Sequence, residues 1–262
     1  MDTTITVINL ILETGFRLGI WILFLWLDKH GPIIRHIDED EMWMYRYPSM
    51  DSIVPKFYLY VIICVFPLIV FFLQFVINGR REQTIPDIFQ SISGLTLAYC
   101  INGILTTTLK LTLGRPRPNF FHRCFPDGYG TDIDNCTGEY HGMLDGRKSF
   151  PSAHASFAFT CMVYLTLHIN KLIDLKKVRV CRGILMFLMM VPILLATLIA
   201  VSRCADYHHH YTDVIGGAIL GTSIAVLTQN IYSTVDAKEA EEILELVEKY
   251  SYISLVPKGK QI

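Results

Sequence analysis

Six long apolar runs divide this sequence and limit what it can fold into. They lie at about 5–27, 57–77, 88–109, 151–169, 183–201 and 212–232. Each is close to the roughly 20 apolar residues that an α-helix needs to cross the hydrocarbon core of a bilayer. Charged residues make up only 18% of the chain and gather between the runs, and the mean hydropathy is +0.38. The pattern predicts an all-α, polytopic integral membrane protein with six transmembrane helices in one bundle.

The ends of the chain and its net charge set further limits. We expect one membrane domain over residues 1–235, followed by an acidic amphipathic tail over 236–262 on the cytosolic side. The first apolar run lacks the basic leader and the cleavage site of a signal peptide, so we expect it to be a retained span. A formal net charge of −1 argues against nucleic acid as a partner.

Two features inside the apolar runs have more than one interpretation. Glu13 and Arg17 interrupt the first run at a spacing of four, which lets them pair on one helix face. That pair either faces neighbouring helices or marks a lipid entry path. Gly217 and Gly221 give the last run a face of small residues, which favours close packing within the bundle. A homodimer contact through this face is the alternative.

The segment SRCADYHHHYTD, at 202–213, carries the strongest sign of chemistry. Asp213 follows His209 at i+4, so both side chains share one face if the segment is helical. A carboxylate there can hold the imidazole Nδ1–H and leave Nε2 free to react. Arg203 adds a permanently charged fork that suits phosphate oxygens. The alternative is structural: a helix-end arginine and a satisfied histidine–aspartate pair.

Topology brings further polar residues to the same side of the membrane. With six spans, the loop after the third span and the loop after the fifth face the same side. The residues at the span ends there are Lys110, Arg117, Ser152, His154, Arg203 and His209. Clustered cations need an anion, and the helix start at Ser152 offers free backbone N–H groups to one. We expect that anion to be the phosphate of a lipid headgroup.

Three blocks of this sequence together resemble a known signature. KLTLGRPRP, PSAH and SRCADYHHHYTD are similar to the K-x6-R-P, P-S-G-H and S-R-x5-H-x3-D pattern of the type 2 phosphatidic acid phosphatase superfamily, with Ala153 in place of the glycine. The stretches RCFPDG, GRKSFPS and SFAF look most like its diacylglycerol-pyrophosphate-phosphatase branch. The resemblance covers about residues 41–221. It implies a metal-independent lipid phosphate phosphatase in the membrane.

The resemblance also implies a role for each matching residue. His209 would be the nucleophile that forms a phosphohistidine, Asp213 would orient it, and His154 would be the general acid and then the general base. The phosphate-binding residues implied are Lys110, Arg117, Ser152, Ala153 and Arg203. Three fixed cations would replace a divalent metal, so no metal or other cofactor is expected. The Cβ at position 153 narrows the pocket, but we expect activity to survive.

Three consecutive histidines, His208, His209 and His210, invite a metal-site interpretation. Consecutive side chains of a helix point about 100° apart, so the three cannot share one ion if the segment is helical. We therefore expect no metal site here, with His208 and His210 as polar residues at the membrane boundary. The cysteines show no zinc-ligand spacing either.

The charged connectors predict an orientation in the membrane. The connectors opposite the predicted site carry the cations Arg80, Arg81, Lys171, Lys176, Lys177, Arg179 and Arg182. The positive-inside rule then puts both termini in the cytosol and the active site at the lumenal or extracellular face. Cys124 and Cys136 would lie in an oxidising space, where we expect a disulfide, with two free thiols as the alternative. Asn135 is a candidate glycosylation site.

The last residues bear on the membrane compartment. Lys258 and Lys260, fifth and third from the end, resemble a di-lysine retrieval signal, which favours the endoplasmic reticulum membrane over the plasma membrane.

The expected substrates are phosphatidate, lysophosphatidate and diacylglycerol pyrophosphate. One rival is a lipid phosphotransferase that uses the same pocket, and another is a non-catalytic lipid-binding membrane protein. A transporter is disfavoured because the polar groups gather at one membrane face rather than at the midplane.

Overall fold

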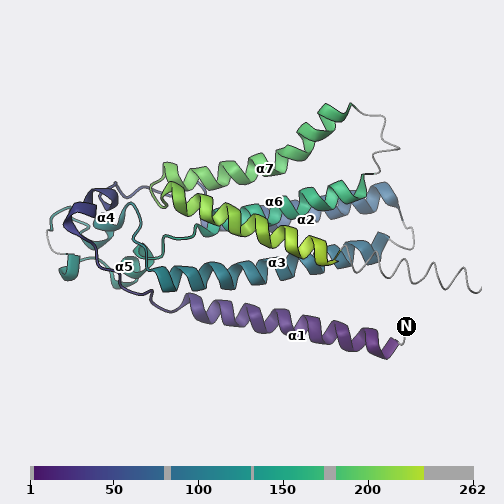
Figure 1. Ribbon diagram of the computed structural model, residues 1–262, viewed down its shortest axis with the longest axis horizontal. Helices are drawn as coiled ribbons and strands as arrows, with labels where there is room; N and C mark the ends of the chain where they lie inside the picture. The colour runs from purple at the N-terminus through teal and green to yellow at the C-terminus, as the bar shows by residue number, and fades with distance from the viewer. Residues whose placement is uncertain (1–2, 80–83, 131–132, 174–180, 233–262) are drawn as a thin grey trace, which may run out of the picture.

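The computed structural model describes residues 3–79, 84–130, 133–173 and 181–232, and every regular element in these ranges is a helix (Figure 1). The long helices are α1 Thr3–Asp28, α2 Lys56–Asn78, α3 Thr84–Leu113, α6 Ala153–Leu172, α7 Arg182–Ala205 and the helix Tyr211–Tyr232. Each coincides with one of the apolar runs. By length and composition, α2, α3, α7 and Tyr211–Tyr232 can cross a membrane. The all-helical prediction is confirmed, with four candidate spans among the described residues.

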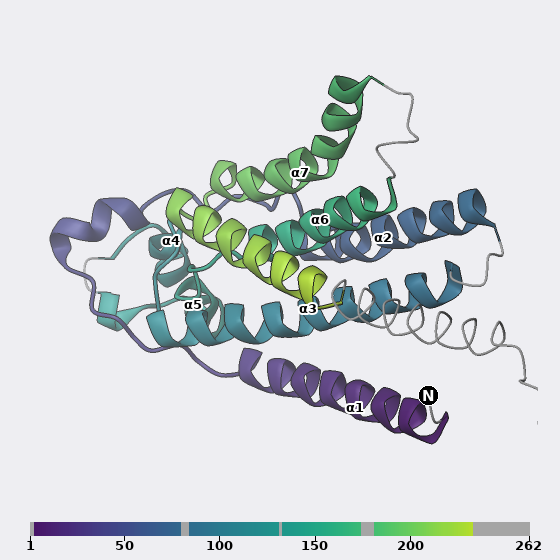
Figure 2. The same ribbon diagram turned by 45° about the vertical axis from the view of Figure 1, so that its right-hand side comes forward.

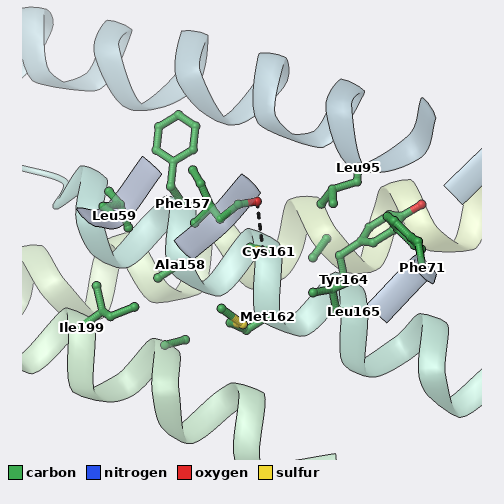
Figure 3. Packing of buried hydrophobic residues seen from close by; sticks show 13 residues of the cluster. Leu59, Phe71, Leu95, Phe157, Ala158, Cys161, Met162, Tyr164, Leu165 and Ile199 are labelled. Carbon is green, nitrogen blue, oxygen red and sulfur yellow. Dashed lines mark hydrogen bonds between the residues drawn. The ribbon is translucent and has the colours of Figure 1, made fainter. Parts of the chain in front are cut away.

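The centre of the bundle is α6, which packs against α2, α3 and α7. Figure 3 shows its side chains from Phe157 to Leu165 surrounded by apolar residues of these three neighbours. The labelled neighbours are Leu59, Phe71, Leu95 and Ile199. Because protein surrounds α6, it can carry buried polar side chains such as Thr160 and His168, which lipid would not accommodate.

The helix Tyr211–Tyr232 lies against α6 through small residues. A Cβ added at Gly217 would lie 3.1 Å from the Cβ of Ala155, and one added at Gly221 would lie 3.0 Å from the backbone nitrogen of Thr160. Both glycines are buried in this contact. The glycine face therefore serves close packing within the bundle, as the sequence favours.

On the other side of the bundle, α1 runs beside α3 in both views (Figure 1, Figure 2). The predicted ion pair is present: Arg17 Nη2 lies 2.7 Å from Glu13 Oε2. The same nitrogen also donates to the hydroxyl of Tyr232, at 2.6 Å. Arg17 therefore connects α1 to the end of the last described helix. Of the two interpretations of the Glu13–Arg17 pair, this contact supports the one in which the pair faces a neighbouring helix.

The connectors at one end of the bundle form a cap. It contains the 3₁₀ helices η1 Glu39–Tyr45 and η2 Ile133–Asn135 and the short helices α4 Phe120–Cys124 and α5 Tyr140–Gly146. Tyr45 is buried against Phe120, Phe121 and Phe125. Cys124 and Cys136 are joined by a disulfide, with their Cα atoms 4.6 Å apart. Asn135 is exposed beside it.

Two helix boundaries at the capped end differ from the prediction. The third helix ends at Leu113 rather than near 109, and Gly114 follows with a φ of +54° and no room for a Cβ beside the carbonyl of Ile33. The helix α7 continues to Ala205 rather than to 201, so Arg203 is helical. Hydropathy ended both helices too early, because their last turns carry polar residues such as Lys110 and Arg203, which lower the local hydropathy.

Several sequence predictions lie outside the described residues. They include the tail at 236–262 with its two terminal lysines, the domain boundary at 235, and most of the basic connectors at 80–81 and 171–182. These predictions stand as expectations.

Candidate active site

A cavity of about 670 Å³ opens between the bundle and the cap. It is lined by residues of five long helices and of the cap. The predicted site residues that line it are Lys110, Arg117, Ala153, His154, Arg203 and His209. Ser152 and Asp213 are fully buried. The cavity therefore brings together Lys110 and His209, which are 99 positions apart in the sequence.

Helix ends place these side chains around the cavity. Lys110 lies in the last turn of α3, His154 in the first turn of α6 and Arg203 in the last turn of α7. Ser152 is the N-cap of α6, and its hydroxyl accepts from the backbone N–H of Ala155 at 3.5 Å. The remaining N–H groups of that first turn can bind an anion.

Backbone hydrogen bonds fix the loops that meet here. Arg117 N donates to the carbonyl of Gly146 at 2.8 Å, and Ser149 N donates to that of Arg115 at 3.0 Å. Ser152 N donates to the carbonyl of Asp213, also at 3.0 Å. The segment after α3, the segment before α6 and the start of the last described helix are thus held as one unit.

The turn between α7 and the last described helix positions His209. Its backbone N–H donates to the carbonyl of Arg203 at 3.0 Å, so the turn folds back over the end of α7. Tyr207 adopts a positive φ of 55° within this turn, and its ring stacks on Tyr47 with centroids 4.9 Å apart. The left-handed backbone disfavours a side chain there, and the stacking contact with the cap supports it.

The relation between His209 and Asp213 differs from the prediction. The helix begins only at Tyr211, so the two residues do not share a helix face. His209 Nδ1 lies 3.7 Å from Asp213 Oδ2, which is beyond hydrogen-bond distance, and this buried nitrogen has no hydrogen-bond partner among the described residues. The i+4 spacing fits a turn as well as a helix, which is why the sequence did not separate the two.

The carboxylate of Asp213 instead receives four other donors. Arg115 Nη1 lies 2.5 Å from Oδ1. The hydroxyl of Ser149 and the backbone N–H of His210 donate to Oδ2 at 2.5 and 2.9 Å. His210 Nδ1 also lies 3.2 Å from Oδ2. Sequence reasoning missed both Arg115, which stands inside the signature block KLTLGRPRP, and Ser149, which stands in the branch-like stretch GRKSFPS.

The three histidines lie in a turn rather than in a helix, and they diverge. His208 lines the cavity with His209, and its Nδ1 lies 3.0 Å from the backbone carbonyl of Asp206. His210 turns toward Asp213. The helical argument for their divergence was wrong, because the backbone of the turn sets their directions. Within the described residues, no group of three or more histidine, cysteine, aspartate or glutamate side chains is placed to hold a metal ion.

The second predicted histidine, His154, is held by the connector before α2. Its Nε2 lies 3.0 Å from the carbonyl of Val54. A carbonyl only accepts, so this contact puts the proton on Nε2. Arg203 Nη1 donates to the same carbonyl at 3.2 Å. Val54 therefore links a cation and a histidine at the cavity wall.

The cations around the cavity differ in how they are paired. Arg203 Nη1 lies 2.8 Å from the buried carboxylate of Asp206. Arg117 Nη2 lies 3.1 Å from Asp145 Oδ1. Lys110 makes no hydrogen bond or ion pair with any described residue, although it lines the cavity. Such a cation is ready to bind an anion that enters.

Burial and neighbouring charges shift the pKa values of two site residues outside the helices, His209 and Asp206. Burial lowers the pKa of His209 well below its ordinary value, so the ring is neutral near pH 7. Burial alone would raise the pKa of Asp206, but the hydrogen bond from His208 and the charge of Arg203 hold it below its ordinary value. The site therefore presents a neutral imidazole beside fixed positive charges, which is what attack on a phosphorus centre needs.

Comparisons with known proteins agree with this chemistry. The sequence profile of the PAP2 superfamily matches residues 92–236, which contain all three signature blocks. The chain is 37% identical to lipid phosphate phosphatase 2 of Arabidopsis thaliana over 203 residues, covering 74% of this chain and 67% of that protein. It is 34% identical to lipid phosphate phosphatase 1 of the same plant over 235 residues, covering 86% and 65%.

The name of a yeast relative refers to a second class of lipid substrate, diacylglycerol pyrophosphate. The chain is 36% identical to diacylglycerol pyrophosphate phosphatase 1 of Saccharomyces cerevisiae over 158 residues, covering 57% of this chain and 54% of that protein. The chain thus spans between about half and two thirds of the length of these three relatives. No solved structure matches the chain.

Proposed function

The chain belongs to the PAP2 superfamily, and from this premise we propose that it is a lipid phosphate phosphatase that hydrolyses phosphatidate and related lipid phosphates or pyrophosphates. One observation carries the proposal: five predicted site residues with ionisable side chains, three cations and two histidines, line a single cavity. They are Lys110, Arg117, His154, Arg203 and His209. The names of the plant and yeast relatives support the substrate class.

The reaction proceeds in two half-reactions. In the first, Nε2 of His209 attacks the phosphorus and the bond from phosphorus to the lipid oxygen breaks, while His154 gives that oxygen a proton. In the second, His154 takes a proton from water, the hydroxide oxygen bonds to phosphorus, and the bond to His209 breaks to release phosphate. Asp213 stabilises the charged imidazole after closing by about 0.5–1 Å onto Nδ1.

The surrounding positive charge stabilises the transferring phosphoryl group. Lys110, Arg117 and Arg203 supply three cations, and the first turn of α6, from Ser152 onward, supplies backbone N–H groups. We propose that these fixed groups take the place of a divalent metal. Activity in EDTA supports this proposal, and its loss on chelation contradicts it.

The membrane placement is also a proposal. All six long helices cross the bilayer, because α1 runs beside α3 and α6 lies at the centre of the four candidate spans. The cap and cavity face the lumen or the outside of the cell, and both termini are cytosolic, with the endoplasmic reticulum favoured. The disulfide between Cys124 and Cys136 supports an oxidising space around the cap. Glycosylation at Asn135 in intact vesicles tests this orientation, and accessibility of the cap only from the cytosol contradicts it.

The decisive experiment measures phosphate release from phosphatidate in detergent with EDTA. We expect the wild-type protein to release phosphate and His209→Ala to release none. His36→Ala is the matched control, because His36 is exposed on the connector before α2 and lies outside the cavity. Release without any added alcohol separates hydrolysis from phosphotransfer. A wild-type protein that is silent on phosphatidate and on diacylglycerol pyrophosphate overturns the proposal.

A further inference from the structure

The cavity has a large excess of positive charge. The cations that line it are Lys29, Lys56, Lys110, Arg117, Arg123, Lys148 and Arg203, whereas the carboxylates that line it are Asp28 and Asp145. This excess favours phosphate binding. It also hinders the release of phosphate, which the proposed hydrolysis must complete in every cycle. One of the two carboxylates is placed to influence that release.

Asp145 bridges two arginines at the cavity wall. Its Oδ1 lies 3.1 Å from Nη2 of Arg117, and its Oδ2 lies 2.9 Å from Nη1 of Arg123. The side chain is 42% exposed, whereas that of Arg117 is only 7% exposed. The two arginines hold the pKa of Asp145 below its ordinary value, although burial alone would raise it. The carboxylate is therefore ionised throughout the physiological range.

The backbone at Asp145 holds the same arginine independently of the carboxylate. Nε of Arg117 donates to the carbonyl of Asp145 at 2.9 Å, and the backbone N–H of Arg117 donates to that of Gly146 at 2.8 Å. The first of these bonds and a bond from Nη1 to the carbonyl of His208, at 3.4 Å, hold the guanidinium, and the second holds the backbone of Arg117. The terminal nitrogen can then change its partner from the carboxylate to a phosphate oxygen, while Arg123 keeps hold of Asp145 through the other oxygen.

The other carboxylate that lines the cavity, Asp28, makes no such contact with Arg117. Asp28 ends α1, and its backbone carbonyl accepts from Nζ of Lys148 at 2.9 Å. Its carboxylate makes no ion pair with a described residue. Asp28 and Asp145 therefore carry the same charge into the same cavity, but only Asp145 contacts an arginine of the predicted phosphate site.

We propose that Asp145 is an internal counter-ion that exchanges with phosphate on Arg117. Without phosphate it neutralises a nearly buried guanidinium, whose charge would otherwise have no counter-ion among the described residues. An entering phosphate must displace it, and the carboxylate competes again when free phosphate is ready to leave. Asp145 thus weakens phosphate binding and promotes product release. This inference rests on the proposed function, since it takes phosphate as the product.

The test is a calorimetric titration of the full-length protein in detergent with inorganic phosphate, which gives the dissociation constant for phosphate. Because Asp145→Asn removes the competing charge while keeping the shape, we expect it to bind phosphate about tenfold more tightly, the size of one charge-assisted hydrogen bond. Inhibition of turnover by added phosphate should strengthen by the same factor. A residue with a merely structural role would weaken binding when replaced.

Two further variants separate contact from charge. Asp28→Asn removes the same charge from the cavity without touching Arg117, and we expect a clearly smaller gain in phosphate affinity than for Asp145→Asn. Asp145→Glu keeps the charge and should bind phosphate as the wild-type protein does. If Asp145→Asn fails to fold, Asp145→Ser is measured in its place. Unchanged or weaker phosphate binding by the folded variant overturns the proposal.

The titration requires no turnover, so it separates this inference from the proposed function. A protein that releases no phosphate from any lipid, but whose Asp145→Asn variant binds phosphate more tightly, supports the counter-ion and contradicts hydrolysis. A protein that hydrolyses phosphatidate while both aspartate variants gain phosphate affinity equally contradicts the specific role of Asp145.

Discussion

The two ends of the bundle each bury a histidine, and only one of them is suited to chemistry. At the end far from the cap, His168 is 2% exposed on α6. Its Nε2 lies 2.8 Å from Gln74 Oε1, and its Nδ1 lies 3.1 Å from the hydroxyl of Ser91. Both ring nitrogens are therefore occupied, by side chains of α2 and α3.

At the capped end, His209 is just as buried, at 3% exposed, but its surroundings differ. It lines a cavity, and neither ring nitrogen makes a hydrogen bond to a described residue. Cations line the same cavity. Burial is thus no guide to reactivity here. An unoccupied ring nitrogen beside a charged cavity is what distinguishes a reactive histidine from one that joins helices.

The largest expected effect is the difference in turnover between variants of these two histidines. We expect His209→Ala to lower phosphate release from phosphatidate by at least about 10³-fold, because the nucleophile is lost. His168→Ala should keep most of the turnover per folded molecule. Size-exclusion chromatography of both variants in detergent gives the folded fraction. Equal losses in the two variants would mean that the open nitrogen of His209 has no special role.

The next effect compares a buried arginine, Arg117, with a partly buried one, Arg17. Arg117→Lys should lower turnover by about 10²-fold, because a lysine cannot reproduce the planar fork that holds both the cap and a phosphate oxygen. Arg17→Lys, at the other side of the bundle, should change turnover little, because Arg17 contacts Glu13 and Tyr232 rather than the cavity. The measurement is the steady-state rate with phosphatidate. A larger loss for Arg17→Lys would refute the comparison.

A smaller effect concerns the stability that His168 provides. His168→Ala leaves Gln74 and Ser91 without their buried partner, so we expect the free energy of unfolding to fall by about 1–3 kcal/mol. Thermal unfolding in detergent measures the loss. His209→Ala removes no hydrogen bond between described residues and should lower the melting temperature less. The reverse order would show that the cavity histidine also joins the helices.

The smallest effect concerns the residue that departs from the signature. Ala153→Gly restores the glycine at the first position of α6, beside the cavity. We expect turnover to change by no more than about fivefold, since the backbone freedom of glycine amounts to roughly 0.5–1 kcal/mol. Rates with phosphatidate and with a bulkier lipid phosphate measure it. A gain of more than an order of magnitude would show that the Cβ of Ala153 limits the wild-type protein.

Much of the site could be predicted from spacing alone. Lys110 lies in the last turn of α3, Arg117 follows that helix, and Arg203 lies in the last turn of α7. Two predicted spans separate them, and an even number of crossings predicts that they share one side of the membrane. The same reasoning could not find Asp145, Arg115 or Ser149. These residues matter through contacts with distant segments, such as the bond from Arg115 to Asp213 across 98 positions.

By itself, the sequence determined the helices, because crossing a bilayer depends on the length and apolarity of one segment at a time. It also determined the family, because the spacing within each signature block is a local property. Only the tertiary structure decided that His209 lies in a turn, that Asp213 pairs with Arg115, and that Asp145 pairs with Arg117. Those outcomes depend on which of several suitable partners the packed loops bring within hydrogen-bond distance, and no single segment carries that information.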